Sequence, residues 1–260
     1  MLPLLFSIGP INFYTFALFL AIGFFLSSFL IWRRLRDLGV DEEKTIDLIL
    51  LVALFGLVFA RTFFIIQNLS LLGFKPEHWL LIGKYPGLSF WGSVSGILLT
   101  LFWFSRKEGL NFWQIVDEFT YGLMPFFILI QIGAFFDGSG FGKPTTMPWG
   151  IYIVGSLVKR QPLPLLMAIV FVVLWLFLIK IERQWRAWEW YRSKACGLIA
   201  LLFVFVMMLV NFLIAFWRGG LLYWHWLEII LSLTFVGLSA IVIYLRSGRR
   251  TFGKIKEKKK

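Results

Sequence analysis

The chain has 260 residues, of which 59% are hydrophobic and only 15% are charged, with a formal net charge of +12. Soluble domains average about 45–50% apolar and about 25% charged residues, so this composition excludes a soluble globular enzyme and a disordered chain. One cysteine excludes a disulfide framework, and two histidines leave little for a metal cluster. We therefore expect a helical protein that crosses a membrane several times, with no metal and no organic cofactor.

Seven apolar runs approach the length of about 20 residues that a spanning helix needs. In chain order they cover residues 11–32, 48–66, 88–104, 119–136, 163–181, 198–217 and 227–245. The runs are continuous, whereas barrel strands alternate apolar and polar residues. We expect an all-α integral membrane protein with about seven transmembrane helices, in a single polytopic domain over residues 1–247. Residues 248–260 are a basic segment that we expect to form a disordered cytoplasmic tail.

Lys and Arg set the predicted orientation, because cytoplasmic loops are enriched in them. Of the 26 Lys and Arg residues, 19 follow the first, third, fifth and seventh runs, and six lie on the other side. This asymmetry predicts an outside N-terminus and a cytoplasmic C-terminus. Because membrane topology accounts for the positive net charge, we expect no nucleic-acid partner. Two longer segments, 67–87 and 137–162, then face outward, and their Gly and Pro residues predict loops.

Arg61 is a cation inside the second apolar run, where an unpaired charge is costly. Two interpretations remain open for it. The long side chain reaches the outer surface or takes a structural partner. Alternatively, the guanidinium binds an anion, because its planar fork fits a phosphate group.

Other polar residues gather near the predicted outer ends of the runs. Gln131 and Asp137 lie near the end of the fourth run, Asn211 lies inside the sixth, and Arg218 ends it. Asn211 and Arg218 are seven residues apart and therefore share one helix face. Gln and Asn in such positions often form hydrogen bonds between helices. The alternative is a polar cavity that opens outward, in which Arg61 and Arg218 receive an anionic head group.

Five short strings follow one another along the chain. They are SIGP at 7–10, FAR at 59–61, GLSFWG at 87–92, FWQIVD at 112–117 and QIGAFFDGSGFG at 131–142. Their order and spacing resemble the prolipoprotein diacylglyceryl transferase family from residue 7 to about 245. The resemblance implies a seven-span protein of the bacterial plasma (inner) membrane. It also implies transfer of a diacylglyceryl group from phosphatidylglycerol to the cysteine thiol of a lipoprotein precursor, with loss of glycerol-1-phosphate.

The departures from the family pattern fall on its chemistry. Six positions at which the family has Arg, Asn, Glu or His hold another residue here, namely Trp91, Gln131, Ala134, Asp137, Ser139 and Asn211. Trp91 replaces the family histidine. The glycines at 133 and 142 are retained, as are two cations, Arg61 and Arg218.

The resemblance leaves two functions open. In an active, divergent transferase, we expect Asp137 to act as base. The lipid head group would then contact the remaining site residues, which are Arg61, Gln131, Ser139, Asn211 and Arg218. The alternative is a non-catalytic relative that binds phosphatidylglycerol, another anionic phospholipid or a lipoprotein precursor signal peptide without transfer. A small-solute transporter unrelated to the family is a third interpretation.

Overall fold

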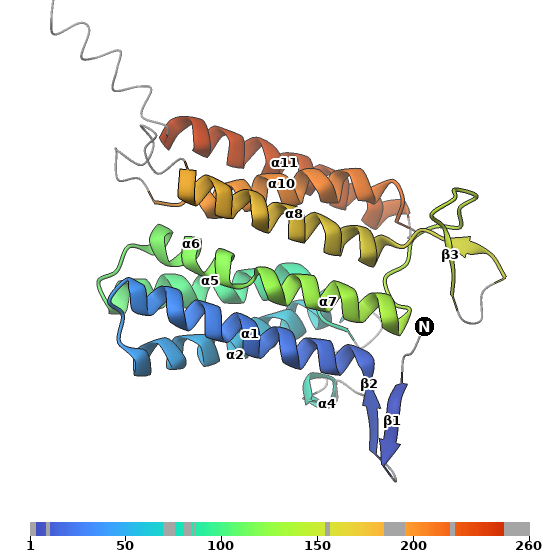
Figure 1. The fold of residues 1–260 in the computed structure, drawn as a ribbon, viewed down its shortest axis with the longest axis horizontal. Helices are drawn as coiled ribbons and strands as arrows, with labels where there is room; N and C mark the ends of the chain where they lie inside the picture. The colour runs from blue at the N-terminus through green and yellow to red at the C-terminus, as the bar shows by residue number, and fades with distance from the viewer. Residues whose placement is uncertain are drawn as a thin grey trace, which may run out of the picture. The chain divides into compact units, whose positions relative to one another are not determined.

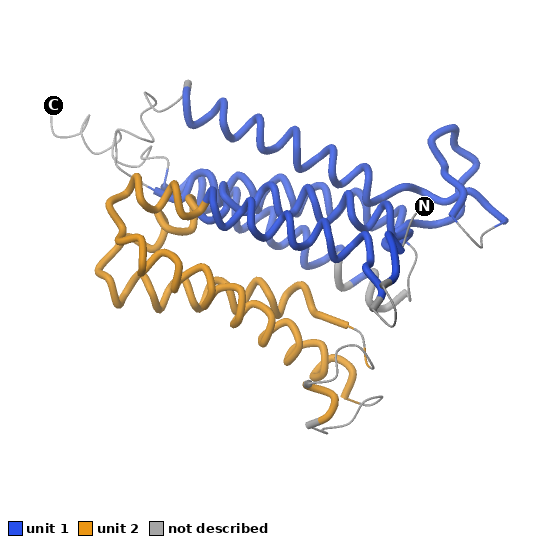
Figure 2. The backbone as a smooth tube through the Cα atoms, turned by 60° about the horizontal axis from the view of Figure 1, so that its bottom comes forward, with its two compact units in different colours: residues 1–30, 119–260 blue, residues 31–118 orange. Residues whose placement is uncertain are grey.

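The computed structural model describes residues 4–8, 11–69, 76–80, 85, 87–153, 157–184, 196–218 and 222–246 (Figure 1). The chain divides into two compact units (Figure 2). Unit 1 comprises Met1–Leu30 and Phe119–Lys260, and unit 2 comprises Ile31–Glu118. Helices α1 (Thr15–Asp37) and α6 (Phe112–Gly122) each cross a boundary between the units. The predicted basic tail lies outside the described residues.

Among the residues that the structure describes, six helical segments are long and apolar enough to cross a membrane. They are Thr15–Asp37, Glu42–Gln67, Phe112–Asp137, Leu163–Arg183, Leu198–Ala215 and Ile229–Arg246. This confirms the all-α integral membrane class. The third predicted run is also helical, as α5 (Phe90–Lys107), but it is not among these six, and it ends in two cations, Arg106 and Lys107. The count of seven spans and the orientation therefore stay predictions.

The fourth predicted span begins earlier in the structure than in the sequence prediction. Helix α6 starts at Phe112, whereas the predicted fourth run starts at residue 119, after two acidic residues. Glu118 accepts a hydrogen bond from the guanidinium of Arg34 and forms an ion pair with it. Because this partner compensates the carboxylate, the helix continues through an acidic position that the local sequence marked as a boundary.

Unit 2 is built on the close packing of α2 (Glu42–Gln67) against α5. Two glycines one helical turn apart on α5 allow the approach. A Cβ atom at Gly92 would lie 2.4 Å from the carbonyl oxygen of Phe59, and one at Gly96 would lie 2.6 Å from that of Phe55. This small-xxx-small spacing lets two backbones meet in a membrane, where van der Waals packing rather than water drives association.

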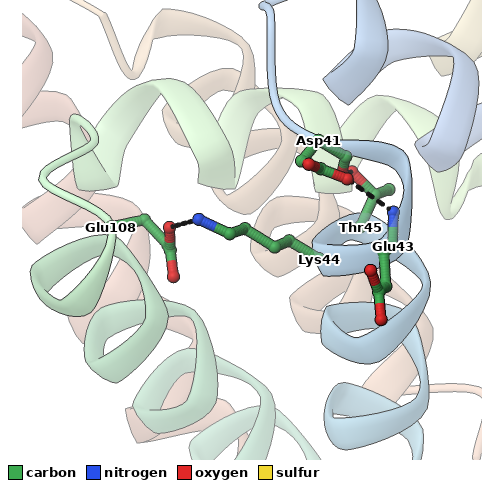
Figure 3. A network of polar contacts seen from close by, with 5 residues as sticks. All are labelled: Asp41, Glu43, Lys44, Thr45 and Glu108. Atoms are coloured by element: carbon green, nitrogen blue, oxygen red, sulfur yellow. Dashed lines mark hydrogen bonds and ion pairs between the residues drawn. The ribbon is translucent and has the colours of Figure 1, made fainter.

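Polar contacts fix the start of α2 (Figure 3). The side chain of Asp41 caps the helix by accepting a hydrogen bond from the Glu43 amide at 2.9 Å. Thr45 adds a bond from its hydroxyl to the Asp41 carbonyl. The Lys44 ammonium lies 2.6 Å from Glu108, just after α5. Exposed ion pairs of this kind add little to stability, so the glycine-lined contact remains the main support of the pair.

Unit 1 contains the remaining elements. They are β1 (Leu4–Ile8), β2 (Ile11–Tyr14), most of α1, α7 (Met124–Asp137), β3 (Ile151–Tyr152), β4 (Lys159–Arg160), α8 (Leu163–Gln184), α10 (Leu198–Ala215) and α11 (Leu222–Arg246). Buried side chains of α7, α8 and α10 form its apolar core, namely Met124, Ile128, Phe171, Leu174, Leu178 and Ile199. Phe127 joins the three helices, because it stacks on Phe171 at 5.2 Å and on Phe203 at 5.9 Å.

Helix α7 also packs closely on α1. A Cβ atom at Gly133 would lie 2.9 Å from the Cβ atom of Phe19, so only glycine allows this approach. Near the start of α7, Pro125 interrupts the helical hydrogen-bond pattern. The hydroxyl of Ser27 accepts a bond from the Phe126 amide at 3.0 Å, which satisfies a donor left without a helical partner.

The two longer segments differ from each other. Of the first, the described part includes a short helix, α4 (Pro76–Leu80). The second contains no helix in its described part and instead carries the antiparallel pair β3–β4, with Tyr152 opposite Lys159. Both observations fit segments broken by Gly and Pro, although the short helix α4 was not predicted.

Candidate lipid-head site

A chain of polar side chains joins α10 to α11 in unit 1. The Arg218 guanidinium donates to the side-chain oxygen of Asn211 at 3.3 Å, and the Asn211 amide donates to the Ser232 hydroxyl at 3.1 Å. Ser232 is completely buried. The structure therefore brings Asn211 and Arg218 into contact, and it also realises the hydrogen bond between helices that the sequence suggested for Asn211.

Ser232 is a site residue that the sequence analysis missed. It lies in an apolar run together with Thr234 and Ser239, whose hydroxyls bond to carbonyls of their own helix. Nothing in the local pattern distinguishes the hydroxyl that faces Asn211 from the two that do not. Only the packing of α11 on α10 selects it.

The end of α7 carries three further predicted residues. Gln131 and Asp137 are half-buried, and Ser139 is exposed. The helix ends at Asp137, and Gly138 follows in the left-handed region with φ of 84°. Within the described part of the chain, the side chains of these three residues have no hydrogen-bond partner, so their polar atoms are available to a ligand.

The segment after α7 returns to the end of α10. The Lys143 amide donates to the Trp217 carbonyl at 2.9 Å. At Gly142, a Cβ atom would lie 2.5 Å from the same oxygen, which explains why a glycine is retained there. Ser139 precedes Gly142 by three residues, a span of at most about 11 Å. Since Arg218 follows Trp217 directly, the ends of α7 and α10 lie at the same end of unit 1 (Figure 1).

Arg61 lies in unit 2 and is 3% exposed. Its Nε donates to the carbonyl of His78 at 2.9 Å, and a second nitrogen donates to the carbonyl of Gly87 at 2.8 Å. A third nitrogen also donates to the His78 carbonyl. The guanidinium therefore ties α2 to two points of the first long segment. These contacts match the structural interpretation of Arg61, and anion binding by Arg61 stays a prediction.

Two other residues of unit 2 bear on the predicted site. The His78 imidazole is buried beside Tyr85, and its Nδ1 has no hydrogen-bond partner within the described residues. Its Nε2 lies 3.8 Å from a carboxylate oxygen of Glu77. Trp91, which replaces the family histidine, is half-buried at the start of α5, edge-on to Phe90 at 5.5 Å.

The six spans define the class: this is a protein that crosses a membrane several times. A family model described as "Prolipoprotein diacylglyceryl transferase" matches residues 3–245. The chain belongs to this family, as the motif order predicted, and it is a multi-pass protein of the bacterial inner membrane.

Similar proteins carry the name phosphatidylglycerol–prolipoprotein diacylglyceryl transferase. One from Thermoanaerobacter sp. (strain X514) is 30% identical over 148 residues, which are 57% of this chain and 58% of the relative. One from Wolinella succinogenes is 30% identical over 51% of this chain and 45% of the relative. In these two relatives, the chain spans about half of their length. One from Pseudomonas paraeruginosa is 27% identical over 240 residues, covering 86% of this chain and 85% of the relative.

Proposed function

We propose that this chain transfers a diacylglyceryl group from phosphatidylglycerol to a prolipoprotein, the reaction for which its relatives are named. The observation that carries the proposal is the position of Arg218, a cation held by Asn211 at the end of α10. Asp137 ends α7 at the same end of unit 1 and Ser139 follows two residues later; neither side chain has a partner within the described residues. Family membership supplies the reaction type, and these residues supply a phosphate ligand, polar contacts and a carboxylate.

In the proposed reaction, a bond forms between the acceptor sulfur and a glyceryl carbon of the lipid. The bond from that carbon to the phosphate oxygen breaks, and glycerol-1-phosphate leaves with the electron pair. Arg218 binds the phosphate and stabilises the charge that grows on it, since a guanidinium fits phosphate oxygens with two parallel bonds. Asp137 takes the proton from the thiol. Gln131 and Ser139 form hydrogen bonds to the head group.

The replaced residues predict a slow enzyme. A hydrogen bond to a charged group contributes about 1.5–3 kcal/mol. Each arginine that has become a neutral amide, at Gln131 and Asn211, therefore removes roughly a tenfold or larger factor from phosphate stabilisation. Both replacements still offer amide donors. We expect turnover well below that of relatives with the full arginine set, and a requirement for a higher phosphatidylglycerol content.

The test is a transfer assay with the full chain in phosphatidylglycerol liposomes and a lipobox peptide that carries one cysteine. Mass spectrometry detects the added diacylglyceryl group. We expect product from the unaltered chain and none from Arg218→Ala. Arg106→Ala is the matched control, because this arginine lies at the end of α5, with its guanidinium 5.2 Å from the ring centre of Phe102. It should retain activity.

The contrary result is also informative. If the folded chain forms no product while a relative with the full arginine set is active alongside it, transfer by this chain is refuted. Phosphatidylglycerol that then co-purifies with the chain, but not with Arg218→Ala, would identify a non-catalytic lipid-binding relative.

A further inference from the structure

In the described part of residues 138–162, five large apolar side chains of unit 1 are exposed. Trp149, Met147, Val158, Tyr152 and Leu157 are between 47% and 98% exposed. We refer to these five residues as the hairpin surface, because they lie on and next to the pair β3–β4. Several large exposed apolar side chains on one short segment are typical of a site of contact with a membrane or another molecule.

The hairpin surface rests on a fixed backbone. Tyr152 pairs with Lys159 across β3 and β4, and Ile151 pairs with Arg160. Beneath the strands, the buried side chain of Gln161 accepts a hydrogen bond from the Trp149 indole at 2.9 Å. The same amide donates to the Thr145 hydroxyl at 3.1 Å. The exposure of these apolar residues is therefore a property of an ordered element.

The hairpin surface also lies next to spanning helices. The Lys143 amide bonds to the Trp217 carbonyl at the end of α10. At the other end of the segment, the Gln161 carbonyl accepts a bond from Leu163, the first residue of α8. The segment is thus tied at both ends to helices that cross the membrane, which places it at the level where their apolar spans end.

The charge of the segment selects the partner. Residues 138–162 contain Lys143, Lys159 and Arg160 and no Asp or Glu. The Lys159 ammonium lies 5.6 Å from the ring centre of Tyr152, so cationic and aromatic groups occupy the same face. Tyr and Trp next to Lys and Arg suit the boundary between head groups and acyl chains, and cations there attract anionic lipid. A signal peptide begins with a positively charged region, which these cations would repel.

We propose that the hairpin surface, with Lys143, Lys159 and Arg160, binds anionic phospholipid head groups and gathers them beside the helix ends. This inference deepens the proposed function, on which it rests for the identity of the lipid as the donor phosphatidylglycerol. The lipid contact itself is independent of turnover.

The test places a polarity-sensitive fluorophore at Thr146→Cys, an exposed position on the same segment, in a Cys196→Ser background that removes the single native cysteine. The full chain is reconstituted in nanodiscs of phosphatidylcholine with increasing phosphatidylglycerol. We expect a blue shift that saturates with phosphatidylglycerol. Changing Lys143, Lys159 and Arg160 to Gln should raise the midpoint tenfold or more, since each cation near an anionic surface is worth roughly a fivefold factor.

The matched control changes three cations elsewhere, Arg33, Arg106 and Lys107, to Gln and should leave the midpoint unchanged. Lys143→Gln alone, with a smaller shift, guards against misfolding of the triple variant. If the midpoint is the same with and without the three cations Lys143, Lys159 and Arg160, the proposal is overturned. A blue shift that requires a lipobox peptide, and not phosphatidylglycerol, also overturns it and identifies a peptide surface. Because no turnover is measured, a chain without transferase activity can still show the lipid response.

Discussion

Removal of the Ser232 hydroxyl tests whether the position of the Arg218 guanidinium, and not only its charge, matters for binding of the head group. Ser232 accepts a hydrogen bond from the Asn211 amide, and the oxygen of that amide accepts from Arg218. Ser232→Ala leaves the cation and its direct partner in place but removes the contact that fixes the orientation of the amide. We expect the head group to bind less tightly, although Ser232 itself lies behind the residues that would touch lipid.

The expected size follows from the kind of bond that is lost. Hydrogen bonds between helices in a membrane contribute about 0.6 kcal/mol on average and at most about 1.7 kcal/mol. With 1.4 kcal/mol per factor of ten, the loss corresponds to about a 3- to 16-fold effect. We expect Ser232→Ala to lower the free energy of unfolding by this amount and to raise the apparent KM for phosphatidylglycerol by about this factor, with kcat changed less.

Ser239→Ala is the matched control. Ser239 is also a buried serine of α11, but its hydroxyl donates to the Phe235 carbonyl of the same helix at 2.7 Å. The assay measures the apparent KM in liposomes of graded phosphatidylglycerol content and the unfolding midpoint in detergent. A double-mutant cycle of Ser232→Ala with Asn211→Leu should show coupling. Equal KM values for the two serine variants, or additivity within about 0.3–0.5 kcal/mol, would refute the positioning chain.

Three further predictions test other parts of the molecule. Gly92→Val should lower the free energy of unfolding by about 1–3 kcal/mol, because the added side chain overpacks the contact with α2. Gly237→Val is the control: a Cβ atom there would meet nothing within 4 Å, so this variant should have the melting temperature of the unaltered chain. Arg61→Gln should expose residues 67–87 to limited proteolysis at least tenfold faster, and unchanged cleavage would contradict its role as a tie. Asp137→Asn should lower the transfer rate about 10²- to 10⁴-fold with little change in melting temperature; an unaffected rate would exclude this carboxylate as the base.

The sequence predicted the helices well because apolar length is a local property. Six of the seven runs are essentially helical in the structure, and the segment rich in Gly and Pro after α7 is not. In the first run, residues 11–32, the prediction was wrong at the start, because Ile11–Tyr14 pair with β1 as strand β2 and α1 begins only at Thr15. The errors are at helix ends. The start of α6 carries a local signal that the prediction overlooked, because the side chain of Asn111 accepts a hydrogen bond from the Trp113 amide at 3.1 Å. What a short window does not contain is the Arg34 partner of Glu118, 84 residues away in sequence.

The same distinction holds for the site. Asn211 and Arg218 were predicted as neighbours on one helix face. They do contact each other, but α10 ends at Ala215 and Arg218 reaches Asn211 from the turn that follows. The partners of Arg61 are the carbonyls of His78 and Gly87, and any residue type presents a carbonyl. Sequence therefore indicated that Arg61 needs a partner and not which partner it has. The structure identifies the partners, because it places the carbonyls of His78 and Gly87 within hydrogen-bond distance of Arg61.

The residues that this chain retains and those it replaces have different physical roles. Gly133 and Gly142 allow close backbone approaches, to α1 and to the end of α10, and no other residue type fits. Gly133 sets the packing of α7 on α1, and Gly142 lets the segment after α7 approach the end of α10. By contrast, Gln131 and Asn211 stand where the family pattern has arginine, and each keeps an amide donor while losing a charge. The framework of the site is thus kept with fewer cations.

A site with fewer cations binds an anionic lipid more weakly, but occupancy depends on local concentration as well as on affinity. The three cations of the hairpin segment, Lys143, Lys159 and Arg160, would raise the phosphatidylglycerol concentration beside the helix ends if they bind lipid as proposed. The two proposals together predict that the effect of these cations on transfer depends on the phosphatidylglycerol content. Changing the three cations to Gln should reduce transfer most at low phosphatidylglycerol content, and the difference should vanish in liposomes of pure phosphatidylglycerol, where the donor is saturating.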